Sequence, residues 1–156
     1  MRISEGIDRR AVVVRPPWST FEEAISGLVE RLAEIGKIQR ALIEQAKARI
    51  CEREAIASTA MVDIGVSIPH ARVEGIKGIV AATAVSPAGV YQVADGAPIG
   101  IVTLVLSSPS LTGEHLNFLS SMSMLLQSEH TRAGLRNAAS PDEIWRLVHE
   151  NESLRA

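Results

Sequence analysis

The histidines are the side chains best suited to chemistry, because imidazole titrates near neutral pH and can act as a nucleophile, a base or a ligand. His70 directly follows Pro69 at the end of an alternating apolar stretch over residues 62–68, and Arg72 comes shortly after it. The alternation predicts a strand that ends at the proline. His70 should then lie just beyond a strand end, where open α/β sheets tend to bind ligands. An idle, exposed loop histidine is the competing interpretation, and the pattern leaves both open.

His115 is expected in the first turn of a helix that begins near Glu114, with Thr112 as its N-cap. The partial positive charge of a helix N-terminus favours a neutral imidazole and attracts anions. A neutral His115 could therefore donate an N–H to a phosphate, although periodicity alone favours a helix-start histidine that bonds to its own loop. His130 and His149 are expected on helix surfaces among charged residues, and we interpret both as solvated.

Several other kinds of site lack the residues that they need. No two histidines are spaced i, i+4 and no HExxH occurs, so we expect no metal site. The sequence also lacks GxGxxG, GxxxxGK(S/T) and GxSxG, the patterns of phosphate-binding loops and nucleophile elbows. Cys51 is the single cysteine and lies among acidic residues, so we interpret it as a packed or idle thiol.

Composition limits the possible partners. The chain has 156 residues, with 16 Lys+Arg against 18 Asp+Glu and 3% aromatic residues, which argues against nucleic-acid binding. The longest apolar run, residues 99–106, is too short to span a bilayer, and the first residues do not resemble a secretory signal. We therefore expect a cytoplasmic protein that does not insert into membranes.

Hydrophobic periodicity predicts alternating strands and helices. Strands are expected over residues 11–14, 62–68, 79–85 and 99–106, and helices over residues 20–35, 38–50, from 114 onward, 129–137 and from 140 onward. Ser19 and Glu22 have the spacing of a capping box at the start of the first helix. The strand over residues 99–106 is apolar on both faces and should be central.

The order of these elements predicts an α/β fold, a mixed parallel and antiparallel sheet flanked by helices. We expect one domain over residues 1–156, with a core at about residues 8–150. On the helix that begins near Glu114, we expect the buried side to consist of Leu116, Leu119, Met122, Ser123 and Leu126.

Several motifs carry a family resemblance. They are Ile-Pro-His-Ala-Arg at residues 68–72, Glu-Arg-Glu and Ser-Thr within residues 52–59, Asp-Gly-Ala-Pro at 95–98, Glu-His-Leu-Asn-Phe-Leu at 114–119, and the segment 140–147. In their order and spacing they resemble the type-2 IIA domains of the bacterial phosphoenolpyruvate-dependent phosphotransferase system. These domains comprise the fructose/mannitol type and its nitrogen-regulatory relative, and the resemblance covers essentially the whole chain.

The resemblance implies a mixed sheet flanked by helices and a protein-to-protein phosphoryl relay. His70 would accept a phosphoryl group from a phosphohistidine of HPr or of its nitrogen-branch paralogue. Arg53 and His115 would lie beside it, Arg53 to stabilise the phosphate charge and His115 to donate a hydrogen bond. Arg72 would be a candidate for docking the partner. The relay implies no cofactor and no metal.

Three functions stay open at this point. The chain contains no IIB-like cysteine motif and no HPr-like segment, which favours a stand-alone regulatory phosphoprotein of the nitrogen type. The first alternative is a phosphocarrier that passes the group to a IIB cysteine in sugar uptake. The second is a degenerate binding module without phosphorylation. The support for this second alternative is the stretch at residues 60–65, which is one residue longer than the glycine-rich stretch that the family often has there. In addition, Gly100 stands where the family more commonly has Asp.

Overall fold

The computed structural model describes residues 2–155 and is built on a mixed sheet. The strands of this sheet are β1 (Ile7–Val14), β2 (Ala60–Met61), β3 (Val66–Ser67), β4 (His70–Arg72), β5 (Ile79–Val85) and β8 (Ile101–Ser107). Their order is β1-β5-β8-β3-β2, and β4 also pairs with β8. The β1/β5, β3/β8 and β4/β8 pairs are parallel, whereas β5/β8 and β2/β3 are antiparallel. A separate hairpin joins β6 (Tyr91–Gln92) to β7 (Pro98–Ile99).

The centre of the sheet is the antiparallel pair of β5 and β8. Every residue of both strands is buried, as is typical of strands covered on both faces. The two strands pair along their whole length, from Ile79 opposite Ser107 to Val85 opposite Ile101. The predicted mixed sheet and its central apolar strand are therefore confirmed.

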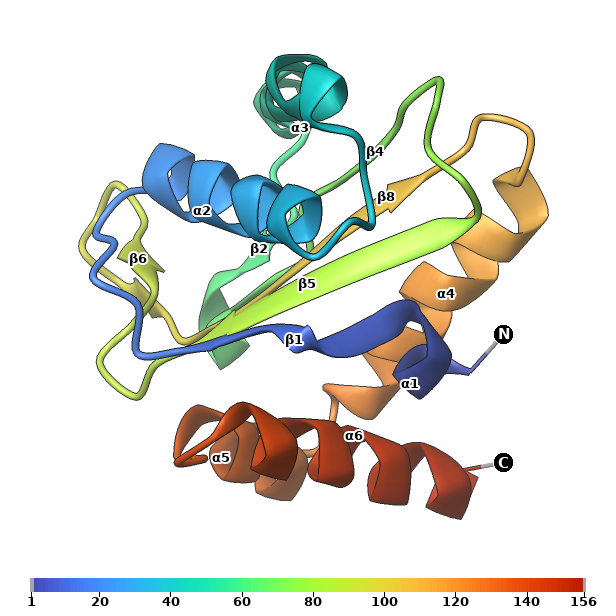
Figure 1. Cartoon of the computed structure of the whole chain (residues 1–156). Coiled ribbons are helices and arrows are strands. Elements are labelled where there is room, and N and C mark those ends of the chain that lie inside the picture. The colour runs from blue at the N-terminus through green and yellow to red at the C-terminus, as the bar shows by residue number, and fades with distance from the viewer. Residues whose placement is uncertain (1, 156) are drawn as a thin grey trace.

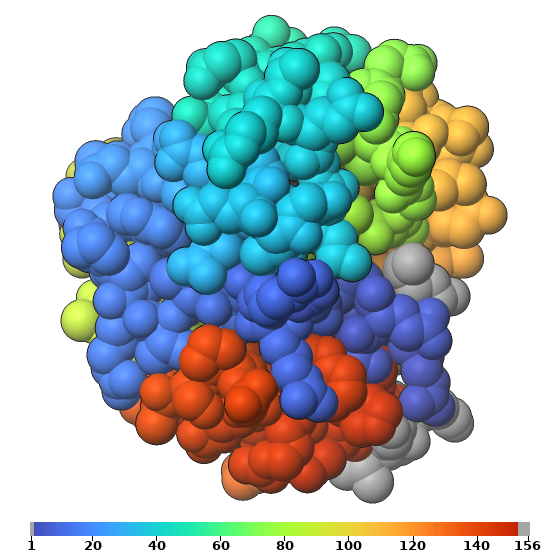
Figure 2. Space-filling model, viewed as in Figure 1, coloured from blue at the N-terminus to red at the C-terminus, as the bar shows by residue number. Residues whose placement is uncertain are grey.

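Helices cover both faces of the sheet (Figure 1). One face carries α2 (Phe21–Glu34), the 3-10 turn η1 (Arg40–Leu42) and α3 (Ile43–Ile56). The other carries α1 (Ile3–Gly6), α4 (Thr112–Leu125), α5 (Glu129–Arg136) and α6 (Pro141–Arg155). Each layer closes its own aliphatic cluster against the sheet. In Figure 2, β1 (dark blue) lies between α2 and α3 on one side and α6 (red) on the other.

The cap of α2 differs from the predicted one by one residue. The N-cap is Thr20, whose hydroxyl accepts the backbone N–H of Glu23, and the Glu23 carboxylate in turn accepts from the Ser19 backbone. Both alternatives have Ser or Thr three residues before Glu, so the sequence spacing could not distinguish them. The difference does not change the buried face of the helix.

The single strand predicted over residues 62–68 is wrong. A 3-10 turn, η2 (Val62–Ile64), separates β2 from β3, and Gly65 ends the turn with a φ of +66°. The Gly65 carbonyl then accepts the backbone N–H groups of Gly100 and Ile101. These long-range hydrogen bonds override the local alternation, so β3 is only two residues long. His70 is consequently the first residue of the new strand β4 and not a residue beyond a strand end.

The buried face of α4 also differs from the prediction. Its buried residues are His115, Phe118, Met122 and Leu125, whereas Leu116 is 55% exposed. Thr112 is the first helical residue and Leu111 the N-cap. The helix is rich in apolar residues all round, so periodicity alone could not choose the inward face. The actual rotation turns His115 inward.

The two remaining histidines differ from each other. His130 is exposed on α5, as predicted. His149 is not a free surface residue, because its ring stacks on Trp145 with centroids 5.1 Å apart and its Nδ1 lies 3.4 Å from the Ser4 hydroxyl. It helps to tie α6 to α1, together with Glu152, whose carboxylate lies 3.7 Å from the same Nδ1.

Candidate functional site

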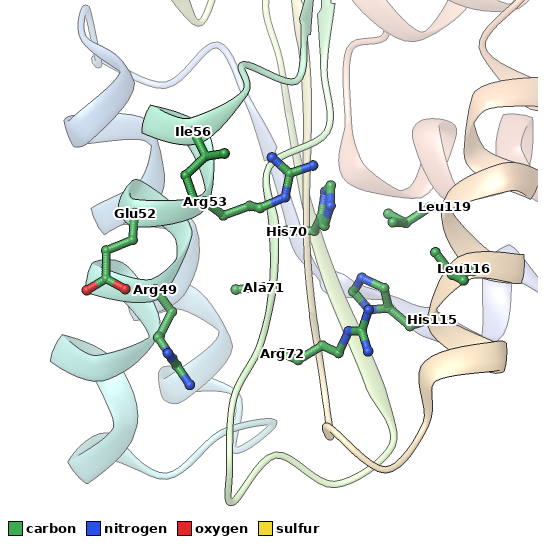
Figure 3. A pocket seen from close by; sticks show the side chains of 10 residues that line it. All are labelled: Arg49, Glu52, Arg53, Ile56, His70, Ala71, Arg72, His115, Leu116 and Leu119. Carbon is green, nitrogen blue, oxygen red and sulfur yellow. The ribbon is translucent and has the colours of Figure 1, made fainter.

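A cavity of about 460 Å³ opens where α3, β4 and the start of α4 meet (Figure 3). Its lining residues are Arg49, Glu52, Arg53, Ile56, His70, Ala71, Arg72, His115, Leu116 and Leu119. All four site residues predicted from the sequence are in this set. They come from segments far apart in the chain, and the sheet brings them together because β4 pairs with β8, which leads into α4.

Backbone contacts fix both the position and the tautomer of His70. The carbonyl of Pro69 accepts the N–H of Val105 at 2.9 Å, which holds the start of β4 against β8. The Nδ1 atom of His70 lies 2.8 Å from the carbonyl oxygen of Ile68. A carbonyl can only accept, so Nδ1 carries the proton in this hydrogen bond. In the neutral ring, the other nitrogen, Nε2, therefore carries the lone pair.

His115 is a buried neutral partner of His70. Its side chain is 2% exposed, and the two ring centroids are 5.4 Å apart with the rings tilted by 59°. Its Nδ1 lies 2.5 Å from the hydroxyl of Ser107. Burial first, and then the charges of His70 and Arg72, lower the pKa of His115 from 6.5 to about 4. The ring is therefore uncharged near neutral pH.

Within residues 2–155, three arginines line the cavity, and the guanidinium groups of two of them, Arg53 and Arg72, lie beside its histidines. Arg53 projects from the last turn of α3, where its Nη1 donates to the carbonyl of Ala57 at 3.0 Å. Figure 3 shows its guanidinium beside the His70 ring. Arg72 follows His70 on β4, and its Nη1 donates to the Thr112 hydroxyl at 2.8 Å. Its guanidinium lies next to His115 in the same view.

The altered stretch at residues 60–65 does not separate Arg53 from His70. The Glu54 carboxylate anchors the start of this stretch, accepting the backbone N–H of Thr59 at 2.7 Å and its hydroxyl at 2.8 Å. Residues 62–64 of this stretch form the 3-10 turn η2, and Arg53 and His70 line one cavity. At Gly100, a Cβ would come within 2.8 Å of Arg136 Cδ, so an aspartate there would need Arg136 to move.

Some residues of the site were not expected from the sequence. Arg49 lies one helical turn before Arg53, and the exposed Ile56 and Leu116 form apolar edges of the cavity. Ser107 was also missed, although a polar residue at the end of an apolar strand was a detectable signal. The rotation of α4 explains the omission, because the interaction of Ser107 with His115 exists only when His115 faces inward.

The comparisons with known proteins agree with this architecture. Residues 6–151 match the family described as "Phosphoenolpyruvate-dependent sugar phosphotransferase system, EIIA 2". The chain belongs to this family. It is 29% identical over 147 residues to the 2-O-alpha-mannosyl-D-glycerate-specific EIIABC component of Escherichia coli, covering 92% of this chain and 22% of that protein. The first curated relatives are thus much longer, and the chain spans about a quarter of their length, 22% and 24%.

Relatives of similar length are found as well. The nitrogen regulatory protein of Bradyrhizobium diazoefficiens is 25% identical over 150 residues, with 95% of each chain covered. The crystal structure of nitrogen regulatory protein IIA-Ntr from Neisseria meningitidis superposes with a TM-score of 0.79 at 22% identity, covering 94% of this chain and 98% of the other. Such a structural likeness shows the type-2 IIA fold. Within residues 2–155, none of the helices has the length and apolar character that a membrane crossing requires.

Acidification is expected to destabilise the protein through His115. Because its pKa is about 4 in the folded protein and 6.5 in the reference state, the unfolded chain binds more protons in this range. The free energy of unfolding should therefore fall as the pH decreases from 6.5 to 4. A shift of this size corresponds to about 3 kcal/mol. Urea denaturation at a series of pH values measures the loss.

The matched variant for this measurement is His115→Gln, which has no imidazole to protonate. Its unfolding free energy should change much less than that of the natural protein over the same pH range, whatever its absolute stability. Parallel pH profiles for the two proteins would show that His115 is not the group responsible.

Proposed function

We propose that this protein accepts a phosphoryl group on Nε2 of His70 from the phosphohistidine of an HPr-like carrier, and that it acts as a regulatory phosphoprotein of the nitrogen type. The observation that carries the proposal is the hydrogen bond from His70 Nδ1 to the carbonyl of Ile68. It leaves Nε2 as a nucleophile in a cavity that also contains Arg53 and His115.

The transfer follows from this geometry. The Nε2 lone pair of His70 attacks phosphorus while the N–P bond of the donor breaks, and its electron pair returns to the donor ring. The transition state is loose and carries its negative charge on the equatorial oxygens, so positioned cations and N–H donors stabilise it most. Arg53 supplies a permanent charge with a planar pair of donors, which matches phosphate geometry. His115 supplies a neutral donor from the opposite side of the cavity.

The edges of the cavity suit a protein donor. Ile56 is 83% exposed and Leu116 is 55% exposed, and they border the cavity on α3 and α4. Exposed aliphatic side chains near an opening are typical of contact surfaces. Arg49 and Arg72 add positive charge, which would favour a partner that offers acidic groups around its own histidine. We expect this exchange to take place in the cytoplasm.

Relatives of matching length that are nitrogen regulatory proteins support the regulatory role. The nitrogen regulatory protein of Bradyrhizobium diazoefficiens aligns over 95% of both chains. Transfer to a IIB cysteine is the second candidate, because the fructose-specific EIIA component of Haloferax volcanii also aligns over 89% of both chains. In that case His70 would serve as donor as well as acceptor.

Phosphorylation can be tested with purified components. The protein is incubated with labelled phosphoenolpyruvate, enzyme I and either HPr or its nitrogen-branch paralogue. We expect one acid-labile, base-stable phosphoryl group, located on His70 by fragmentation mass spectrometry. Failure of both carriers to label the protein would refute the proposal.

Labelled protein then separates the two candidate roles. Fructose- and mannitol-type IIB domains are added, and the transfer of label is followed with time. Retention of the label supports the regulatory role, whereas rapid transfer to a IIB cysteine would establish the carrier role instead.

A further inference from the structure

Ser107 is a buried hydroxyl in an otherwise apolar environment. It ends β8 after Val105 and Leu106, and its side chain is 0% exposed. A hydroxyl buried in this way costs free energy unless it is hydrogen-bonded. Within residues 2–155, the side-chain partner of its Oγ is Nδ1 of His115, at 2.5 Å. The backbone of Ser107 is already paired, since its carbonyl accepts the N–H of Val73.

The direction of this hydrogen bond determines the tautomer of His115. If the ring donated from Nδ1, the hydroxyl proton of Ser107 would have no acceptor among the hydrogen bonds of the described residues. An unsatisfied buried donor costs about 1–3 kcal/mol. If Ser107 donates to Nδ1, its proton and the ring nitrogen are both satisfied. The second arrangement is therefore favoured, and it places the ring proton on Nε2.

The neighbouring histidine favours the same arrangement. His70 has its proton on Nδ1, so its Nε2 presents a lone pair to the cavity. His115 lines the same cavity, with its ring centroid 5.4 Å from that of His70. Figure 3 shows the edge of the His115 ring turned toward the space beside His70. An N–H of His115 at this position can donate to the lone pair of His70 Nε2 before the transfer. After the transfer, it can donate to the oxygens of the phosphoryl group on His70.

We propose that Ser107 is a positioning residue that holds His115 in the Nε2–H tautomer, so that His115 presents a hydrogen-bond donor to the phosphoryl group on His70. The catalytic consequence rests on the proposed function, whereas the tautomer itself does not. The tautomer matters because the pKa of His115 is lowered to about 4. Near neutral pH the ring has one N–H, so only one of its two nitrogens can donate a hydrogen bond.

Nitrogen NMR of the imidazole rings tests the tautomer directly in the unphosphorylated protein. Long-range proton–nitrogen correlations distinguish a protonated Nε2 from a protonated Nδ1. We expect Nε2–H for His115 in the natural protein near neutral pH. In Ser107→Ala, we expect a substantial population with the proton on Nδ1. An Nδ1–H tautomer in the natural protein, or an unchanged tautomer in Ser107→Ala, would overturn the proposal.

Phosphorylation kinetics provide the second measurement. Loss of one well-placed donor should slow labelling of His70 in Ser107→Ala by about 10-fold. The matched control is Ser108→Ala, which removes the hydroxyl of the next residue. That hydroxyl lies outside the cavity and forms a hydrogen bond with the hydroxyl of Ser110. Its labelling rate should be unchanged. Equal rates for Ser107→Ala and the natural protein would show that the tautomer has no catalytic consequence.

The two measurements fail in different ways. If the natural protein is not labelled by any carrier, the proposed function is wrong, yet the NMR result still decides whether Ser107 sets the tautomer. If Ser107→Ala does not fold, the natural protein still gives the decisive spectrum, because a proton on Nδ1 of His115 would overturn the proposal without any variant.

Discussion

Replacing His70 with glutamine is expected to abolish phosphorylation. Glutamine is similar in size, and backbone hydrogen bonds to β8 hold the start of β4, so this strand should keep its geometry. Its amide has no nucleophilic lone pair at the position of Nε2. We expect no label above background under conditions that label the natural protein completely. Gel autoradiography and intact-mass spectrometry measure the difference.

The control for this experiment is His130→Gln. His130 is exposed on α5 and lies outside the cavity, so this variant should be labelled like the natural protein. Circular dichroism and thermal unfolding should show that both variants are folded. Label that persists in His70→Gln would mean that another residue is the acceptor.

Replacing Arg53 with glutamine is expected to have the next largest effect, a decrease of about 100-fold or more in the labelling rate. Arg53 lines the cavity beside His70, and no other residue of α3 places a guanidinium so close to that ring in Figure 3. Its charge opposes the negative charge that develops on the transferring group. Rapid-quench measurements at saturating carrier report the rate of the chemical step.

Two further variants define what Arg53 contributes. Arg53→Lys keeps the charge but loses the planar pair of donors, so we expect a rate between those of Arg53→Gln and the natural protein. Arg40→Gln removes an exposed arginine of η1 that lies outside the cavity, and it should not change the rate. Comparable losses in Arg40→Gln and Arg53→Gln would indicate a general effect of net charge and not a local one.

The strands of the sheet centre were predictable because their signal is local. The apolar runs at β5 and β8 require burial on both faces wherever they pack, and the structure has both strands almost at the predicted bounds. The start of α6 was predictable too, because its signal acts within one helical turn: Pro141 is the first helical residue, and the Ser140 hydroxyl accepts the backbone N–H of Glu143. The motif around His70 identified the family for the same reason, since its residues are contiguous.

Features that depend on long-range contacts were not predictable. Residues 62–68 alternate like a strand, yet the hydrogen bonds from Gly100 and Ile101 to the Gly65 carbonyl divide them. The inward face of α4 was equally undetermined, because apolar residues surround the helix and only packing against the sheet chooses among them. That rotation decides whether His115 faces the cavity or the solvent.

By itself the sequence determined the fold class and the family, and it singled out four side chains that line one cavity: Arg53, His70, Arg72 and His115. Only the tertiary structure decided how these side chains are arranged. The proton of His70 is placed by the Ile68 carbonyl, and the pKa of His115 is lowered by burial. Both effects arise from atoms that the folded chain brings to within a few ångströms of each other. Burial in particular depends on which residues pack around a side chain, and the order of residues in the sequence does not specify that packing.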